Sequence, residues 1–215
     1  MTNGTETKQE KNLAQKKIVL MGLAEAGRNT VCKKFLNEKW VPQKNDRYYA
    51  TIDYETHERT ICGTKFTFFN LGGQTAFLDR FIDKIPETIF GGIDTLVFIV
   101  DVIKIPELNR VKYYFDKALE KINIYNPKAL IYIFINKMDI LPNSFKEEIP
   151  HTIKEYLLQK ISIKKDKIQF YETSVFNNST NRAIEAIYRA NIHIFDEDLI
   201  KEGKKKKKIN ETIYL

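Results

Sequence analysis

The sequence predicts one α/β domain in which helices cover both faces of a mostly parallel β-sheet. Two apolar runs, residues 96–100 and 130–135, show no alternation with polar residues. Strands of this kind are expected where both faces of a parallel sheet are buried. Segments with helical spacing separate the strand-like runs, and this alternation gives a three-layer α/β/α sandwich. The ligand of such a fold lies beyond the carboxyl ends of the strands.

In the first half of the chain, an apolar run at residues 16–21 predicts a strand, and Gly22 and Gly27 follow it. Residues 29–38 have helix-compatible spacing. Residues 40–50 mix turn-forming and aromatic residues and are expected to be an exposed loop. Residues 52–61 and 65–71 are strand-like and closely spaced, which predicts an antiparallel hairpin and one antiparallel edge strand. Residues 72–92 are expected to form a second loop.

In the second half, the two apolar runs are expected to be strands, and residues 106–124 between them have apolar residues at helical spacing. Proline is tolerated in the first turn of that helix. A helix at 147–160, a strand at 169–173 and a helix at 180–194 complete the series. The whole order is β–α–β–β–loop–β–α–β–α–β–α, without an internal repeat.

Composition fits a soluble globular protein of 215 residues, with 43% hydrophobic and 29% charged residues. The formal net charge is +7, but five of these charges lie in the run from Lys204 to Lys208. We therefore expect a flexible lead-in at residues 1–15, a domain at 16–194 and a lysine-rich tail at 195–215. The tail is either a solvated segment or a weak contact with a membrane surface, and no nucleic-acid partner is expected.

The two cysteines, Cys32 and Cys62, are too few for a disulfide framework and favour a reducing compartment. The polar N-terminal stretch does not resemble a signal peptide, and no apolar run reaches the roughly 20 residues that span a bilayer. A cytoplasmic location is therefore expected.

The loop after the first strand matches a phosphate-binding loop in part, reading Gly22-Leu23-Ala24-Glu25-Ala26-Gly27-Arg28-Asn29-Thr30. The full motif has two glycines four residues apart, followed by Lys and then Ser or Thr. Its glycines allow backbone N–H groups to point at phosphates beside a helix N-terminus. Both glycines are present in the expected strand-to-helix context, while Arg28 and Asn29 replace the other two residues. Many strand-to-helix turns are glycine-rich, so the loop alone is a weak match.

A second motif, Asn136-Lys137-Met138-Asp139, directly follows the apolar strand that ends at residue 135. The Asp139 carboxylate can accept two hydrogen bonds from guanine, a donor pair that adenine lacks. Asn136 can brace neighbouring loops, and the Lys137 stem can cover the base. The alternative is a polar turn that only ends a strand, and the position of the motif favours guanine binding.

The segment Asn70-Leu71-Gly72-Gly73-Gln74 resembles the second switch of the Ras superfamily, in the Gly-Gly-Gln form shared by the Arf and Rag/Gtr branches. Residues 51–55 resemble the first switch of Rag/Gtr proteins, and residues 172–175 are similar to the family's Glu-Thr-Ser-Ala loop. The resemblance covers residues 16–193. It implies a P-loop small GTPase domain that binds GTP or GDP with Mg²⁺ and acts as a switch.

The resemblance implies a set of nucleotide-binding residues: Gly22, Glu25, Ala26, Gly27, Arg28, Asn29, Thr30, Thr51, Gly73, Asn136, Lys137, Asp139, Ser174 and Val175. It implies Gln74 and Arg28 as catalytic residues. Asn29, Thr51 and Asn70 occupy the family's metal-related positions. Thr30 carries a hydroxyl one residue beyond the family's metal ligand and is expected to point away from the metal.

Three departures from the family predict weakened Mg²⁺ binding and slow hydrolysis. Arg28 replaces the compact ammonium of Lys with a wide guanidinium. Asn29 and Asn70 replace a hydroxyl and a carboxylate, whereas Mg²⁺ prefers hard oxygen ligands in strict octahedral geometry. A loosely held metal loses electrostatic stabilisation of the transition state.

Three functions therefore stay open. The first is a GTP/GDP switch that binds protein partners near residues 40–52 and 72–90. The second is a degenerate domain that serves as a partner-binding scaffold without nucleotide turnover. The third, a P-loop ATP enzyme such as a small kinase, is disfavoured by Asp139. Trp40, Tyr48 and Tyr49 either form part of the partner surface or pack against the hairpin. Rag/Gtr proteins usually carry a second, dimerising domain, and the sequence does not imply one here.

Overall fold

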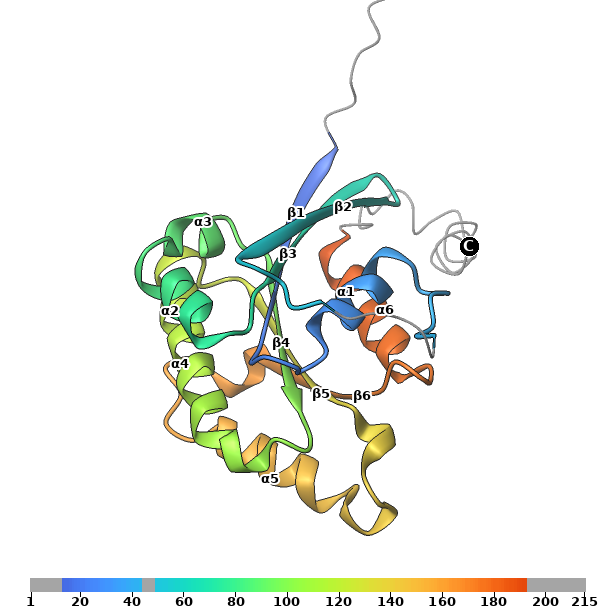
Figure 1. Ribbon diagram of the computed structural model, residues 1–215. Coiled ribbons are helices and arrows are strands. Elements are labelled where there is room, and N and C mark those ends of the chain that lie inside the picture. The colour runs from blue at the N-terminus through green and yellow to red at the C-terminus, as the bar shows by residue number, and fades with distance from the viewer. Residues whose placement is uncertain (1–12, 44–48, 193–215) are drawn as a thin grey trace, which may run out of the picture.

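The computed structural model describes residues 13–43 and 49–192. Within these residues, six strands form one sheet in the order β2-β3-β1-β4-β5-β6 (Figure 1). Neighbouring strands are parallel except β2 and β3, which form the antiparallel hairpin at one edge. The predicted sheet with a single antiparallel edge strand is confirmed. The strands are β1 (Ala14–Met21), β2 (Tyr54–Ile61), β3 (Thr64–Leu71), β4 (Thr95–Asp101), β5 (Leu130–Asn136) and β6 (Ile168–Thr173).

Strand β1 begins two residues before its predicted start, because Ala14 and Gln15 already pair with β3. The rest of the expected lead-in lies outside the described residues, apart from Leu13. The expected lysine-rich tail, with Lys204 to Lys208, also lies outside them.

Four of the helices match expected segments, with shifts of up to three residues at their ends. They are α1 (Arg28–Leu36), α4 (Leu108–Tyr125), α5 (Glu148–Leu157) and α6 (Ser179–Asn191). Helix α1 ends earlier than predicted because Asn37 adopts an extended conformation. A 3₁₀ turn, Ile105–Glu107, precedes α4 and contains the proline of the predicted first turn.

The predicted loop at residues 72–92 is wrong, because it contains α2 (Thr75–Asp83) and α3 (Pro86–Phe90). Leu78, Phe81 and Ile82 lie on one face of α2 and are buried. Burial of this apolar face stabilises a nine-residue helix that would be marginal in isolation.

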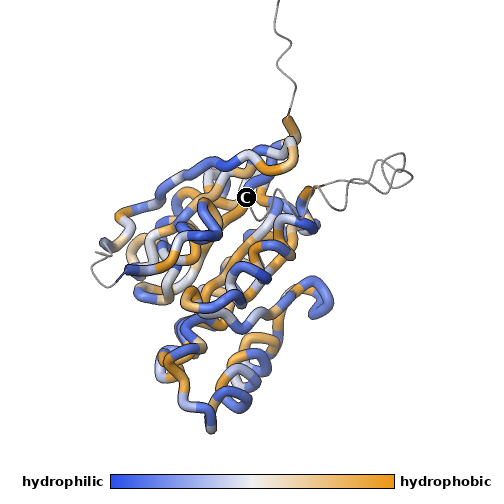
Figure 2. The backbone as a smooth tube through the Cα atoms, turned by 90° about the vertical axis from the view of Figure 1, so that its right-hand side faces the viewer, coloured by the Kyte–Doolittle hydropathy of each residue, from blue (hydrophilic) through white to orange (hydrophobic). Residues whose placement is uncertain are grey.

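The helices cover the two faces of the sheet in separate groups, with α1 and α6 on one face and α2 to α5 on the other (Figure 1). Alternate residues of β1 contribute to each face. Ile18 and Leu20 pack with Phe35 of α1, whereas Val19 and Met21 belong to the core under α2 to α5. In Figure 2 the helices alternate between hydrophobic and hydrophilic segments, as one buried and one solvated face require.

Across residues 13–43 and 49–192, none of the helices combines the length and the apolar character needed to cross a membrane.

Candidate functional site

A cleft of about 530 Å³ lies at the carboxyl ends of β1 and β3, where the sequence predicts a ligand. A smaller depression of about 210 Å³ adjoins it and shares Gly27, Thr30 and Lys137 with it. The larger part is lined by Ala24, Glu25, Gly27, Arg28, Asn29, Thr30, Tyr49, Ala50, Thr51, Gly73, Gln74 and Lys137. The smaller part is lined by Gly27, Thr30, Pro42, Asn136, Lys137, Asp139, Ile140, Val175 and Phe176. Four predicted site residues do not line the cleft: Gly22, Ala26, Asn70 and Ser174.

The loop between β1 and α1 has the tight backbone that its two glycines allow. Gly27 caps α1 with a φ of 93°, and Glu25 also takes a positive φ of 67°. A Cβ atom on Gly22 would lie 2.3 Å from the Ile99 carbonyl oxygen, and one on Gly27 would lie 2.4 Å from Asn136 Nδ2. Both positions therefore exclude a side chain, because the neighbouring backbone and amide leave no room.

Arg28, the first residue of α1, is only 7% exposed. Its Nε and Nη1 atoms are buried and have no hydrogen-bond partner among the described residues. Burial lowers the pKa of the Arg28 guanidinium to about 10, because desolvation disfavours the charged form. A Cβ atom on Gly73 would lie 2.4 Å from Arg28 Nη2, so the guanidinium passes directly beside the second switch. Buried donors on a cation fit an anionic ligand such as a phosphate.

The three residues at the family's metal positions bond to one another. Thr51 Oγ1 donates to Asn29 Oδ1 over 2.8 Å, and Asn70 Nδ2 donates to the same oxygen over 2.9 Å. Asn29 Nδ2 donates to the Tyr49 carbonyl oxygen over 2.9 Å. Thr51 and Asn70 are buried. This donor set contains no carboxylate, and its one oxygen without a partner among the described residues is the buried amide Oδ1 of Asn70. Uncharged amide and hydroxyl oxygens fit Mg²⁺ poorly, because the ion is usually held through one or two carboxylates.

Asn136 and Asp139 lie at the other end of the cleft. Asn136 Nδ2 donates to the Ala26 carbonyl oxygen over 2.9 Å and so ties β5 to the phosphate-binding loop. Ser174 Oγ donates to Asp139 Oδ1 over 2.6 Å and fixes the carboxylate. Lys137 takes a positive φ of 67°, and its ammonium pairs with buried Asp101 at 2.6 Å. The Asp139 carboxylate is therefore held at the cleft by the residue that follows β6, with one oxygen orientated by the Ser174 hydroxyl.

The two expected switch segments are joined to each other through Asp53. The Gly72 N–H donates to the Asp53 carbonyl oxygen over 2.6 Å, and Arg80 of α2 pairs with the Asp53 carboxylate at 2.6 Å. Gln74 is the N-cap residue of α2 and is exposed at the cleft.

The aromatic residues of the first switch segment differ in their surroundings. Trp40 is partly buried, with the Lys33 ammonium 5.0 Å from its ring centroid. Tyr49 is 73% exposed, and Tyr48 lies outside the described residues. The contact found for Trp40 is thus with α1 and not with the hairpin that the sequence suggested, whereas Tyr49 is available at the surface.

Sequence reasoning missed several lining residues, among them Pro42, Ile140 and Phe176. Phe176 directly follows the predicted residue Val175 and is 64% exposed at the smaller depression. The signal that could have revealed Phe176 is its position, because an aromatic residue directly follows the motif at residues 172–175. No motif in the sequence marks Pro42, because its position at the smaller depression depends on the conformation of the chain after α1.

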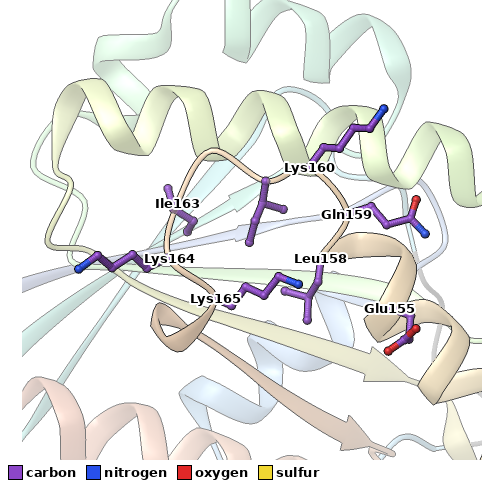
Figure 3. A pocket seen from close by; sticks show the side chains of 8 residues that line it. Glu155, Leu158, Gln159, Lys160, Ile163, Lys164 and Lys165 are labelled. Carbon is purple, nitrogen blue, oxygen red and sulfur yellow. The ribbon is translucent and has the colours of Figure 1, made fainter.

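A second concavity, of about 790 Å³, lies around the loop between α5 and β6, at the amino end of β6. It combines apolar residues such as Ile163 with several lysines. Lys160 and Lys164 extend in opposite directions (Figure 3). Because these two positive charges point apart, we assign no ligand to this concavity.

A six-stranded sheet of this order, with a glycine-containing loop after β1 and a cleft beyond the carboxyl ends of its strands, defines the fold class of the small GTPases. The solved structure of the Arl6 BBS3 small GTPase from Trypanosoma brucei, with bound nucleotide analogue GppNp, superposes with a TM-score of 0.61. That match covers 83% of this chain and 98% of the other at 20% identity, which supports the fold.

The model of the Gtr1/RagA G protein conserved region matches residues 17–208, and the chain belongs to this family. It is 28% identical over 136 residues to GTP-binding protein GTR1 of Saccharomyces cerevisiae, covering 63% of this chain and 43% of that protein. It is 26% identical to GTP-binding protein gtr1 of Schizosaccharomyces pombe, covering 80% and 55% respectively. The chain thus spans about half the length of the curated relatives that it matches.

Proposed function

We propose that this chain is a guanine-nucleotide-binding switch that hydrolyses GTP slowly. The observation that supports this proposal is the placement of Arg28 and Asp139 at opposite ends of one continuous cleft. Arg28 offers buried, unsatisfied donors to phosphate, and Asp139 offers a fixed carboxylate to guanine. The names of the relatives, which describe GTP-binding proteins, are consistent with both roles.

Each part of the cleft would have a distinct task. Backbone N–H groups from Glu25 to Thr30 would hold the phosphates beside the N-terminus of α1. Lys137 and Val175 would cover the base, and Gln74 would orientate the attacking water. Thr51 and Gly73 would face the terminal phosphate from the two switch segments. Mg²⁺ binding is expected to be weak, because amides replace the family's hydroxyl and carboxylate.

Protein partners would bind across the two switch segments, near residues 40–52 and 72–90. Tyr49 and Ile52 support this assignment because they are 73% and 79% exposed in the first segment. Exposed aromatic residues are enriched in protein interfaces. The low cysteine count favours a cytoplasmic location, and the lysine run is either a solvated segment or a weak contact with a membrane surface.

Titration of the purified chain with fluorescent GDP, followed by competition with GTP, GDP and ATP, tests nucleotide binding. We expect GTP and GDP to displace the probe and ATP to leave it bound, because adenine lacks the donor pair for Asp139. Equal displacement by ATP would contradict guanine selectivity. No saturable binding to nucleotide-free protein would contradict the proposal as a whole.

The second candidate function is a partner-binding scaffold that binds nucleotide without turnover. The mutually bonded Asn29, Thr51 and Asn70 favour it, because they leave no carboxylate at the metal position. Single-turnover phosphate release separates the two candidates. A slow release that is abolished in Gln74→Leu supports the switch, whereas no release above that of a protein-free control supports the scaffold.

A further inference from the structure

We propose that Asn29, Thr51 and Asn70 form an amide latch that takes the place of the divalent cation, so that guanine nucleotide is retained without Mg²⁺. The inference rests on the proposed nucleotide binding and concerns how the same cleft is closed. Its three residues come from the start of α1, the first switch segment and the end of β3, respectively. They therefore join three elements that a metal ion would otherwise bridge.

The latch holds the first switch segment at two points through one side chain. The Asn29 amide accepts from Thr51 Oγ1 over 2.8 Å and donates to the Tyr49 carbonyl over 2.9 Å. Asn70 Nδ2 donates to Asn29 Oδ1 over 2.9 Å and approaches Thr51 Oγ1 at 3.4 Å. Thr51 is only 3% exposed, so its contacts with Asn29 and Asn70 are partly shielded from water, whereas the bond from Asn29 to Tyr49 is exposed. Together these bonds hold residues 49–51 on the phosphate-binding loop.

A divalent cation could bind here only by breaking these hydrogen bonds, and no negatively charged side chain of the three would compensate for their loss. The Asn29 oxygen already accepts two hydrogen bonds, and the Thr51 proton is directed at it. Of the side-chain oxygens of Asn29, Thr51 and Asn70, only Asn70 Oδ1 has no partner among the described residues, and it carries no charge. The latch therefore joins the three elements through hydrogen bonds between uncharged groups, whereas in a metal site charged ligands around a cation would join them.

The charge on the phosphates would then be neutralised by the protein rather than by a metal ion. The Arg28 guanidinium is buried within the same lining as Asn29 and Thr51, with two nitrogens that lack an acceptor among the described residues. The Asp53 contacts with Gly72 and Arg80 hold the segment from its other side. Residues 49–53 are thus held at the cleft by contacts that need no divalent cation.

The release rate of fluorescent GDP, measured with excess Mg²⁺ and with excess EDTA, tests the latch in the full chain. We expect the two rates of the wild-type protein to agree within about twofold, because EDTA removes only metal ions and nucleotide retention would not depend on a bound metal ion. In Asn29→Ala we expect release to accelerate about tenfold under both conditions, because the three hydrogen bonds of the Asn29 side chain are lost. Asn143→Ser, an exposed change outside the cleft, serves as the matched control.

The double variant Asn29→Ser with Asn70→Asp introduces the family's hydroxyl and carboxylate. We expect it to gain a dependence on Mg²⁺, with EDTA accelerating release at least about tenfold. EDTA accelerating release from the wild-type protein to the same degree would overturn the proposal. Equal rates for this double variant in Mg²⁺ and EDTA would overturn the placement of the metal position.

Hydrogen exchange of the nucleotide-free protein separates failure of the latch from failure of the proposed function. We expect the amides of residues 49–54 to exchange faster in Asn29→Ala than in the wild type and in Asn143→Ser. If that difference is seen but GDP does not bind, the latch stands and the proposed function fails. Unchanged exchange in Asn29→Ala would overturn the latch whether or not GDP binds.

Discussion

The buried charge of Arg28 is expected to bind phosphate, and it also lowers the stability of the folded protein. Arg28 is 7% exposed, two of its guanidinium nitrogens have no partner in the described part of the chain, and burial lowers the pKa of the guanidinium to about 10. Because the folded state binds the guanidinium proton less well than the unfolded state does, the resulting loss of folding stability is present in full at neutral pH. This loss disappears only as the pH rises above about 10 toward the ordinary pKa of arginine in the unfolded chain. A lowering of this size corresponds to about 3 kcal/mol.

Replacement of Arg28 by Met should therefore stabilise the nucleotide-free protein while removing its response to nucleotide. We expect Arg28→Met to raise the free energy of unfolding by about 1–3 kcal/mol, since the buried charge is gone and the apolar stem is kept. Urea unfolding at pH 7 with and without GDP measures both effects.

Arg28→Lys is the matched control, because it keeps the charge and should keep part of the stabilisation by GDP. A less stable Arg28→Met protein that is still stabilised by GDP would contradict the role of Arg28 in phosphate binding.

At the scale of elements, α2 carries the second switch residues and depends on tertiary packing. Phe81 is fully buried, and Tyr54 of β2 packs against its ring at 6.2 Å. We expect Phe81→Ala to lower the free energy of unfolding by about 3–5 kcal/mol, because it leaves a cavity under the helix.

Arg80→Ala, one residue earlier, removes only a partly exposed ion pair with Asp53 and should cost about 0–1 kcal/mol. Chemical denaturation of the two variants makes the comparison. Equal decreases in the free energy of unfolding for Phe81→Ala and Arg80→Ala would contradict the view that burial of the apolar face is what stabilises α2.

The sheet was predictable because its central strands are continuous apolar runs, a pattern that needs no knowledge of the rest of the chain. Helices α2 and α3 were not, because they are short and lie between the glycine pairs 72–73 and 91–92. Their apolar residues become a helical face only once β3 and α4 supply the surface that buries them. Local propensity therefore underestimates structure where packing stabilises short helices.

The lining of the cleft was predictable where a motif fixes a position relative to a strand, as for Gly27, Asn136 and Asp139. The amide latch was not, because Asn29, Thr51 and Asn70 are about twenty residues apart and their bonding depends on how three elements meet. The burial of Arg28 likewise depends on Gly73, which approaches from another loop. Sequence spacing identifies such residues but does not determine their partners.

At the scale of the whole molecule, the two cores share one sheet and should unfold together. Phe35 lies in the core under α1 and α6, and Phe115 lies in the core under α2 to α5. We expect Phe35→Ala and Phe115→Ala each to lower the stability of the entire domain by about 3–5 kcal/mol.

Unfolding followed by the fluorescence of Trp40, the single tryptophan, and by far-ultraviolet circular dichroism should give one midpoint for each variant. Two separate midpoints would show that the faces of the sheet are independent units.

The central claim, that this cleft selects guanine nucleotides, is tested most directly by the competition of GDP and XDP for the wild-type protein and for Asp139→Asn. An amide at position 139 replaces one acceptor with a donor, which suits the carbonyl of xanthine in place of the amine of guanine. We expect GDP affinity to fall at least about 100-fold and XDP affinity to rise above it. Ser174→Ala, which removes only the hydroxyl that orientates Asp139, should weaken GDP binding about tenfold or less. Unchanged GDP affinity in Asp139→Asn would contradict the account.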